Sequence, residues 1–335
     1  MLANAWNALL RTLGGAASPA GPRGRLLVLI YHRVLREFDP LQPDEPDAGR
    51  FEQEIALLAR NFAVLPLSEA VARLREGRLP ARAACVTFDD GYANNVEVAL
   101  PILLRHGVPA TFFIAVGYLD GGVMFNDKVT ELVRQAPGPA LDLSEFGLGT
   151  LACGALDERR RTLGQLLKLV RYRSPAQRES LVERLLARTA TALPRNVMMT
   201  ADQVRSLRGA GMEIGAHTVT HPILTQVDLD AARSEMAAGK EQLEAIVRDR
   251  VRLFAYPNGR PGIDYGPEHV QLAREVGFQA AVSTATGTAT EATDPYQIPR
   301  VRPWDRSLAA FGLRLVASYW GAEAPSVTAA APGTA

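Results

Sequence analysis

The chain has 335 residues, enough to bury a large core as one large domain or two ordinary ones. Lys and Arg number 37 against 36 Asp and Glu, so no net field attracts nucleic acid or an anionic surface. Two cysteines are too few for a disulfide framework or a thiolate metal site. The composition therefore predicts a neutral partner and no nucleic acid.

Residues 1–24 form an expected N-terminal amphipathic segment that begins "MLANAWNALLRTLGG". It lacks the basic leader and the uninterrupted apolar core of a signal peptide. No stretch of the sequence approaches the roughly 20 apolar residues of a membrane span. We expect a cytoplasmic protein without a transmembrane segment, in which residues 1–15 offer a peripheral contact to a membrane or partner surface.

Seven short apolar runs, rich in β-branched residues, are predicted to be strands that are covered on both faces. They lie at 25–32, 84–90, 110–116, 212–218, 251–257, 279–284 and 297–303. Helical patterns lie between them, for example at 229–247. The alternation of strands and helices predicts βα units, arranged as a barrel or as a doubly wound sheet.

One connection, residues 119–199, is far longer than an ordinary βα loop. Its strongest patterns, "ERRRTLGQLLKLVRY" and "PAQRESLVERLLARTA", predict helices. We expect a helical insertion beside the active face that shapes substrate access and, having no histidine, supplies no metal ligand. Residues 306–335 predict a short helix followed by an Ala/Pro/Thr-rich tail that is expected to be disordered.

Polar residues follow several of the predicted strands. His32 ends the first strand, Asp89 and Asp90 end the second, and "HTVTH" places His217 and His221 after the fourth. Strand ends of a parallel barrel gather on one face, so these side chains are expected to converge. Two imidazoles and a carboxylate make a three-ligand metal set with an open position for water. Alone, HxxxH is typical of surface histidines and Asp is typical of a helix N-cap, although a cap explains only one aspartate.

The stretches "TFDDG", "HTVTH" and "FAYPNG", in this order, resemble the first three motifs of the polysaccharide deacetylase family, also called NodB-homology or carbohydrate esterase family 4. The resemblance covers residues 25–305 and implies a distorted (β/α)7 barrel, here with a helical insertion. It also implies a hydrolase that uses a divalent metal, usually zinc. The expected substrate is an N-acetylated glycan: an amino sugar of a bacterial polysaccharide, glycolipid or precursor, from which the enzyme removes acetyl groups.

The resemblance implies roles for individual residues. Asp90, His217 and His221 correspond to the metal ligands, and Asp89 corresponds to the general base that takes a proton from the attacking water.

The turn made by Tyr256, Pro257 and Asn258 corresponds to the part of the family site that stabilises the oxyanion, through a backbone N–H that we assign to Asn258. The same Pro-Asn-Gly sequence also predicts an ordinary turn, and the two interpretations are compatible.

The sequence departs from the family pattern in three places. The third motif lacks its usual arginine, and the later Asp-Trp and Leu-x-His motifs are absent. Arg300 and Arg302 share a face of the last predicted strand, and we favour Arg300 as the partner of Asp89. "YHRV" resembles an early Tyr-His segment of a branch that acts on exopolysaccharides, in which the histidine resembles the missing acid. This resemblance makes His32 the expected general acid.

Two other classes of function share parts of this sequence pattern. A pseudoenzyme that binds glycan in the same cleft without turnover stays open because of the missing motifs. A haloacid-dehalogenase-like phosphatase is excluded, since that chemistry needs a second Asp where Gly91 stands. His106 and His269 are interpreted as surface residues. Three aromatic residues are either sugar platforms or packing residues: Tyr118, Phe125 and Trp304.

Overall fold

The computed structural model describes residues 2–305, 307–322 and 324–328. Its centre is a curled parallel sheet in the strand order β1-β3-β4-β7-β8-β9, with the short β2 paired to the start of β3. The strands of this sheet are β1 (Leu27–Tyr31), β2 (Ala63–Val64), β3 (Ala83–Phe88), β4 (Ala110–Ile114), β7 (Glu213–Ala216), β8 (Leu253–Ala255) and β9 (Ala280–Val282). Nearly every residue of the six longer strands is buried, as expected of parallel strands that are covered on both faces.

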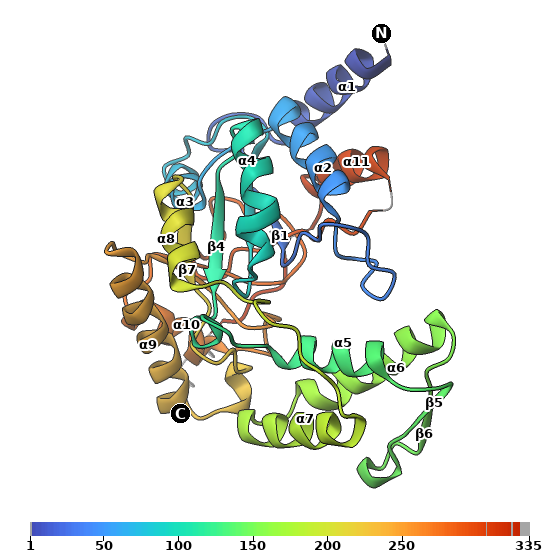
Figure 1. The fold of residues 1–335 in the computed structure, drawn as a ribbon. Coiled ribbons are helices and arrows are strands. Elements are labelled where there is room, and N and C mark those ends of the chain that lie inside the picture. Colours follow the sequence, from blue (N-terminus) through green and yellow to red (C-terminus); the bar gives the residue numbers. More distant parts are fainter. Residues whose placement is uncertain (1, 306, 323, 329–335) are drawn as a thin grey trace.

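Eleven α-helices are present in the described residues, and most of them cover the sheet (Figure 1). They are α1 (Leu2–Ala17), α2 (Ala48–Asn61), α3 (Leu67–Arg75), α4 (Leu100–His106), α5 (Phe125–Gln135), α6 (Leu156–Arg171), α7 (Pro175–Thr189), α8 (Ala201–Gly209), α9 (Leu229–Val247), α10 (Pro267–Glu275) and α11 (Leu308–Ser318). The stripe of Phe51, Ile55 and Leu58 turns α2 toward the core, where all three are buried. The α/β architecture is the distorted barrel predicted from the sequence.

The seventh predicted strand, 297–303, forms only isolated bridges. Ile298 pairs with Val282 of β9 and Val301 pairs with Leu29 of β1, so the segment links the two edges of the curled sheet. Pro299 and Pro303 have no backbone N–H to donate to a ladder, which explains why the segment is not a continuous strand. The barrel is therefore closed here by a few bonds rather than by a full strand.

The insertion at 119–199 contains α5, α6 and α7, which Figure 1 shows gathered at one end of the molecule. They share a separate apolar core that includes Leu132, Leu166 and Leu185. The prediction of a purely helical insertion is wrong in one respect, because β5 (Ala140–Asp142) and β6 (Thr150–Ala152) form an antiparallel hairpin. Both strands are mostly exposed and too short to show an apolar alternation.

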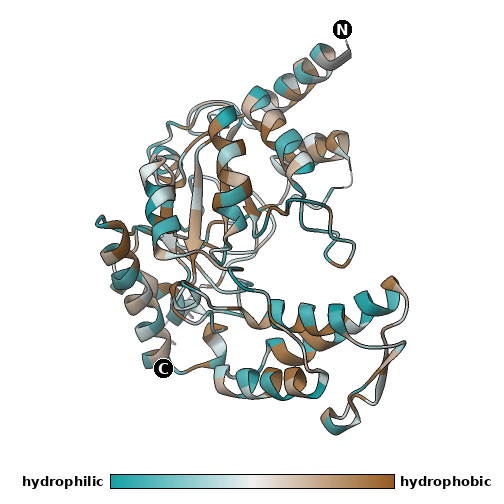
Figure 2. Ribbon diagram, in the orientation of Figure 1, coloured by the Kyte–Doolittle hydropathy of each residue, from teal (hydrophilic) through white to brown (hydrophobic). Residues whose placement is uncertain are grey.

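The two ends of the chain also pack on the barrel. Leu10 of α1 is buried, and a Cβ added at Gly312 of α11 would lie 3.1 Å from its Cδ1. The apolar face of α1 that carries Leu10 is therefore covered within the chain, while Leu9 stays exposed. Figure 2 shows this mixture of hydrophobic and hydrophilic positions along the helix.

The prediction of disorder does not hold for the described tail residues 324–328. Val327 exchanges two backbone hydrogen bonds with the Gln297 side chain, at 2.7 and 2.8 Å, and packs on the core. Residues 329–335 lie outside the described residues.

Candidate active site

Asp89 and Asp90 follow β3 in a tight turn. Asp90 and Gly91 both have positive φ, at 76° and 92°, and a Cβ at Gly91 would lie 3.0 Å from Ile114 Cγ2. A left-handed conformation is costly for aspartate and requires support from its surroundings. Here the reversal turns the two carboxylates in different directions, Asp89 toward Arg300 and Asp90 toward the histidines.

His217 and His221 lie in the loop after β7. Glu235 of α9 accepts hydrogen bonds from the N–H groups of Val219 and Thr220, both at 2.8 Å, and from the Thr220 hydroxyl at 2.7 Å. Within the loop, His221 N–H donates to Thr218 Oγ1 at 3.0 Å. Glu235 was not identified from the sequence, because an acidic residue on a helix is typical of a solvated face. It holds the loop that presents both imidazoles.

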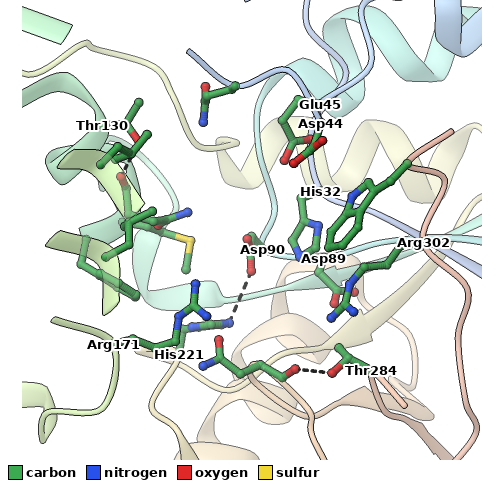
Figure 3. A pocket seen from close by; sticks show the side chains of 18 of the residues that line it. His32, Asp44, Glu45, Asp89, Asp90, Thr130, Arg171, His221, Thr284 and Arg302 are labelled. Atoms are coloured by element: carbon green, nitrogen blue, oxygen red, sulfur yellow. Dashed lines mark hydrogen bonds and ion pairs between the residues drawn. The ribbon is translucent and has the colours of Figure 1, made fainter. Parts of the chain in front are cut away.

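The three predicted ligands converge. Potential ligand atoms of Asp90, His217 and His221 all lie within 4.8 Å of one another, and all three residues are buried. Asp90 Oδ1 is 3.4 Å from His217 Nε2 and 3.5 Å from His221 Nε2, as Figure 3 shows for the second pair. These gaps are longer than good hydrogen bonds.

The donor set fits a divalent cation. His217 Nδ1 lies 2.7 Å from the carbonyl oxygen of Ala255, which can only accept, so Nδ1 carries the proton and Nε2 presents a lone pair toward Asp90. His221 Nδ1 is buried without a hydrogen-bond partner among the described residues. Two imidazole nitrogens and one carboxylate oxygen around a common point are the ligands that catalytic zinc sites use.

The electrostatics of the cluster agree with this fit. Burial raises the pKa of Asp90, but the opposing effects of His217 and His221 are larger, and the net shift of the pKa is downward. Asp90 therefore stays an anion. Burial and the neighbouring His217 lower the pKa of His221 to about 3, which leaves this imidazole neutral and able to bind a metal. Burial lowers the pKa of His217, yet Asp90 and Asp89 raise it overall. The negative charge that attracts a proton to His217 also attracts a cation.

Arg300 contacts Asp89, as favoured from the sequence. Nη1 and Nη2 of Arg300 donate to the two oxygens of Asp89, both at 2.7 Å, and Nε donates to the carbonyl of Ser283 at 2.9 Å. Both side chains are almost fully buried. Burial raises the pKa of Asp89, and Arg300 and His217 outweigh it, so the net shift is downward. The alternative choice, Arg302, lines the pocket instead.

An open pocket of about 450 Å³ lies over this cluster. Asp89, Asp90, His217 and His221 line it together with His32, which Figure 3 shows on the side of Asp89. His32 therefore lines the same pocket as the cluster, as the convergence of the strand ends predicts. Its role as an acid stays a prediction.

The "YPNG" turn is only partly as expected. Asn258 lines the pocket, with φ at 57° and its carbonyl accepting from the Thr284 hydroxyl at 2.6 Å. The Tyr256 ring is fully buried and stacks on Tyr265 at 3.9 Å between centroids, so its side chain does not contact a substrate. The candidate oxyanion group is therefore the backbone after Pro257.

The insertion lines the opposite wall of the pocket. Met124, Phe125, Asn126, Leu163 and Arg171 all contribute to this wall. Phe125 itself is mostly buried, with the guanidinium of Arg178 at 4.5 Å from its ring, so packing explains it better than a sugar platform. Trp304 lines the pocket and is 57% exposed, which leaves its ring available for contact.

One further prediction needs correction, and two other residues lie away from the pocket. His269 is buried rather than on the surface: Nδ1 accepts from Gly266 N–H at 3.0 Å and Nε2 lies 3.2 Å from the carbonyl of Leu224. His106 is half-buried beside Glu52. Tyr118 does not line the pocket, since its hydroxyl donates to the carbonyl of Thr220.

A buried carboxylate near the site was missed. Asp127 of α5 accepts from Arg33 Nη1 and from the Tyr92 hydroxyl, both at 3.0 Å. Burial raises the pKa of Asp127 to about 6, against the opposing effects of Arg33 and Tyr92. Amphipathic periodicity gave no sign of this burial, because an acidic residue in the first turn of a helix is typical of a solvated position.

Among the described residues, no helix combines the length and the apolar character that crossing a bilayer requires.

The barrel has the fold of a known deacetylase. A sequence model of the family described as polysaccharide deacetylase matches residues 76–136 and 179–281, and the gap between the two ranges falls inside the insertion. The Bacillus subtilis protein YxkH, provisionally named a polysaccharide deacetylase, is 22% identical over 280 residues, which are 83% of this chain and 71% of that protein.

Two solved structures share the fold. The Streptococcus pyogenes deacetylase PplD, in complex with acetate, is 20% identical with a TM-score of 0.59, over 87% of this chain and 98% of that one. IcaB from Ammonifex degensii is 17% identical with a TM-score of 0.54, over 91% of this chain and 99% of that one. The chain belongs to the polysaccharide deacetylase family.

Proposed function

We propose that this protein is a metal-dependent hydrolase that removes N-acetyl groups from an amino sugar of a bacterial polysaccharide, glycolipid or precursor. The observation that carries the proposal is the Asp90, His217 and His221 cluster beside an Asp89 held by Arg300, on the floor of an open pocket. One divalent ion, with zinc favoured by the nitrogen and oxygen donors, would lower the pKa of a water and polarise the acetamide carbonyl.

The chain's own residues divide the remaining work. Asp89 is an anion with a lowered pKa, ready to accept the proton of the attacking water. Arg300 fixes both of its oxygens, so the carboxylate keeps one orientation. The backbone N–H of Asn258, in the turn that lines the pocket, is the candidate donor to the oxyanion.

Amide hydrolysis also needs an acid, because the amine is a poor leaving group until its nitrogen is protonated. We assign this proton to His32, which lines the pocket near Asp89. Glu45 lies beside it: burial raises the pKa of Glu45, and the charges of His32 and Arg33 oppose that shift.

Arg300 also bears on the pseudoenzyme alternative. The pseudoenzyme alternative depends in part on the missing motif arginine. Arg300, from another segment of the chain, makes a bidentate contact to Asp89, the proposed base. The contact supports turnover rather than binding alone.

The decisive experiment measures metal content of the purified protein together with acetate release from chitooligosaccharides, poly-N-acetylglucosamine and peptidoglycan. We expect about one divalent ion per chain and acetate release that stops on chelation and returns with zinc. Glycan binding without acetate release, in the metal-loaded protein, would overturn the proposal in favour of a pseudoenzyme.

A further inference from the structure

Guanidinium groups are concentrated around the pocket. Arg171 at the end of α6, Arg260 after β8, and Arg302 after the bridge to β1 all line it, and Arg300 lies beneath it. The chain as a whole carries a formal charge of only +1, so this concentration is local and not part of a generally basic surface.

Two of these four arginines are neutralised by protein carboxylates. Arg300 is paired with Asp89. Arg260 donates from its backbone N–H and from Nε to Asp264 Oδ2, at 2.9 and 3.0 Å, and Asp264 is fully buried. The positive charges of Arg300 and Arg260 are therefore neutralised within the protein and do not attract an anionic ligand.

The other two have no such partner. Among the described residues, no carboxylate forms an ion pair with Arg171 or Arg302, and neither guanidinium donates a hydrogen bond. Arg302 stacks near the ring of Trp304, with 5.0 Å from its Cζ to the ring centroid, which fixes its position without removing its charge. Burial and the neighbouring charges of Arg300, Arg260 and Arg171 lower the pKa of Arg302 against the opposing effect of Asp89, which is itself paired with Arg300.

The two arginines lie on either side of the catalytic cluster. Figure 3 shows Arg171 on the side of His221 and Arg302 on the side of Asp89, with the cluster between them. Four acidic residues line the pocket: Asp89 faces Arg300, Asp90 faces the histidines, and Asp44 and Glu45 lie together beside His32. Arg171 and Arg302 are therefore the two guanidinium groups of the pocket wall that remain available to a negatively charged ligand group.

We propose that the glycan substrate is anionic, with an oxyanion substituent on a sugar next to the acetylated one, and that Arg171 and Arg302 bind this group. Guanidinium forks match the planar oxygens of carboxylates and phosphates. The substituent is thus a uronate carboxylate or a phosphate ester, two sources of the same oxyanion chemistry. This inference rests on the proposed deacetylase function and narrows its substrate.

The test compares three substrates that share N-acetylglucosamine. They are neutral chitotetraose, a hyaluronan tetrasaccharide as the carboxylate arm, and chitotetraose carrying a 6-phosphate as the phosphate arm. The zinc-loaded full chain should show kcat/KM at least about 10-fold higher for one anionic arm than for the neutral one, since each charge-assisted contact is worth about that factor. The arm that wins identifies the substituent.

Arg171→Gln and Arg302→Gln should each lower the ratio of anionic to neutral kcat/KM, and rising salt should lower it in the wild type. The matched control is Arg161→Gln, which removes an exposed charge from the same helix as Arg171 but does not line the pocket. It should leave the ratio unchanged. A wild-type preference for chitotetraose, or equal losses on all three substrates in the Arg171 and Arg302 variants, would overturn the inference.

Calorimetric binding of the same three oligosaccharides separates this inference from the proposed function. Tighter binding of an anionic arm that is lost in Arg171→Gln and Arg302→Gln supports the anion site even if no acetate is released. Acetate release with equal affinity for all three oligosaccharides refutes the anion site and leaves the deacetylase function standing.

Discussion

Arg300 donates two parallel hydrogen bonds of 2.7 Å to the two oxygens of Asp89, and both side chains are withdrawn from solvent. The pair joins a residue after β3 to a segment more than 200 positions later in the chain. A buried carboxylate that keeps a lowered pKa needs such a partner, because burial alone raises its pKa.

Arg300→Lys keeps the charge and loses the bidentate geometry. We expect kcat to fall by about 10²-fold, since a misplaced base loses much of the effect of general base catalysis. Weaker stabilisation of the carboxylate raises the pKa of Asp89, so the acidic limb of the kcat/KM profile should move to higher pH. The measurement is a pH–rate profile, with Arg302→Lys as the matched control whose limb stays in place. A stability loss with no movement of the limb would make Arg300 a structural residue only.

In the proposed mechanism Asp89 is the base and Asp90 is a metal ligand. Asp89→Asn should lose about 10² to 10⁴ of kcat and keep its metal, because Asp89 is committed to Arg300. Asp90→Asn removes an anionic ligand from the cluster. Loss of a residue that only supports a metal ligand weakens metal affinity by roughly 10–100-fold, and we expect a larger loss of zinc affinity here. Zinc titration and acetate release, measured on both variants, check the division. Equal metal loss in the two would contradict it.

Much of this arrangement could be predicted from the sequence. Apolar runs predicted six strands of the sheet, and the order of polar residues at their ends predicted that Asp90, His217 and His221 converge. Alternation placed Arg300 and Arg302 on one face but could not say which is buried. That choice depends on the contacts of Arg300 with Ser283 and Asp89, which lie elsewhere in the chain.

What the sequence did not predict consists of contacts made across the fold. Asp127 is buried only because Arg33 and Tyr92 approach it from other elements. Val327 is ordered only because the Gln297 amide pairs with its backbone. Neither partner is near in the sequence, so periodicity and composition carry no signal for either contact.

Asp127 should make stability depend on pH. Its pKa is raised by burial from about 3.8 to about 6, so the fold favours its protonated form. The stabilisation is fully present below about pH 3.8 and is lost as the pH rises through about 6, a change on the order of 3 kcal/mol. Asp127→Asn cannot ionise and should flatten the urea-unfolding free energy over this window. The exposed Asp202→Asn is the control, and an unchanged slope in Asp127→Asn would contradict the assignment.

Gly239 of α9 lies against the histidine loop. A Cβ there would be 2.9 Å from the carbonyl carbon of Thr218 and 3.0 Å from its oxygen, closer than real contacts allow. Gly239→Ala should therefore displace the loop that carries His217 and weaken zinc binding, despite the gain of about 1 kcal/mol in helix propensity. Gly164→Ala in α6, where a Cβ meets nothing within 4 Å, should show only the gain. Melting temperatures and zinc affinities of the two variants test this prediction. Equal stabilisation by Gly239→Ala and Gly164→Ala, with zinc affinity unchanged, would contradict the predicted clash with Thr218.

His32 is the residue to which the proposed function assigns the proton of the leaving amine. Of the five histidines, His217 and His221 belong to the metal cluster, and His269 is fully bonded away from the pocket. His106 lies beside Glu52, which leaves His32 as the only histidine besides the cluster that lines the pocket in the described part of the chain. A general acid at this site must leave room for the sugar, so we expect the His32 ring roughly 5 to 7 Å from the bound metal.

His32→Ala should lower kcat by about 10²- to 10⁴-fold while zinc content and glycan affinity stay within about 2-fold of wild type. The basic limb of the kcat profile should disappear as well, because that limb reports loss of the acid's proton. Activated aryl acetate esters provide the control, since a phenolate that leaves without protonation does not need the acid. These esters should be cleaved by the variant at near wild-type rates, whereas an equal loss on ester and amide substrates would assign His32 to positioning the site rather than to proton donation.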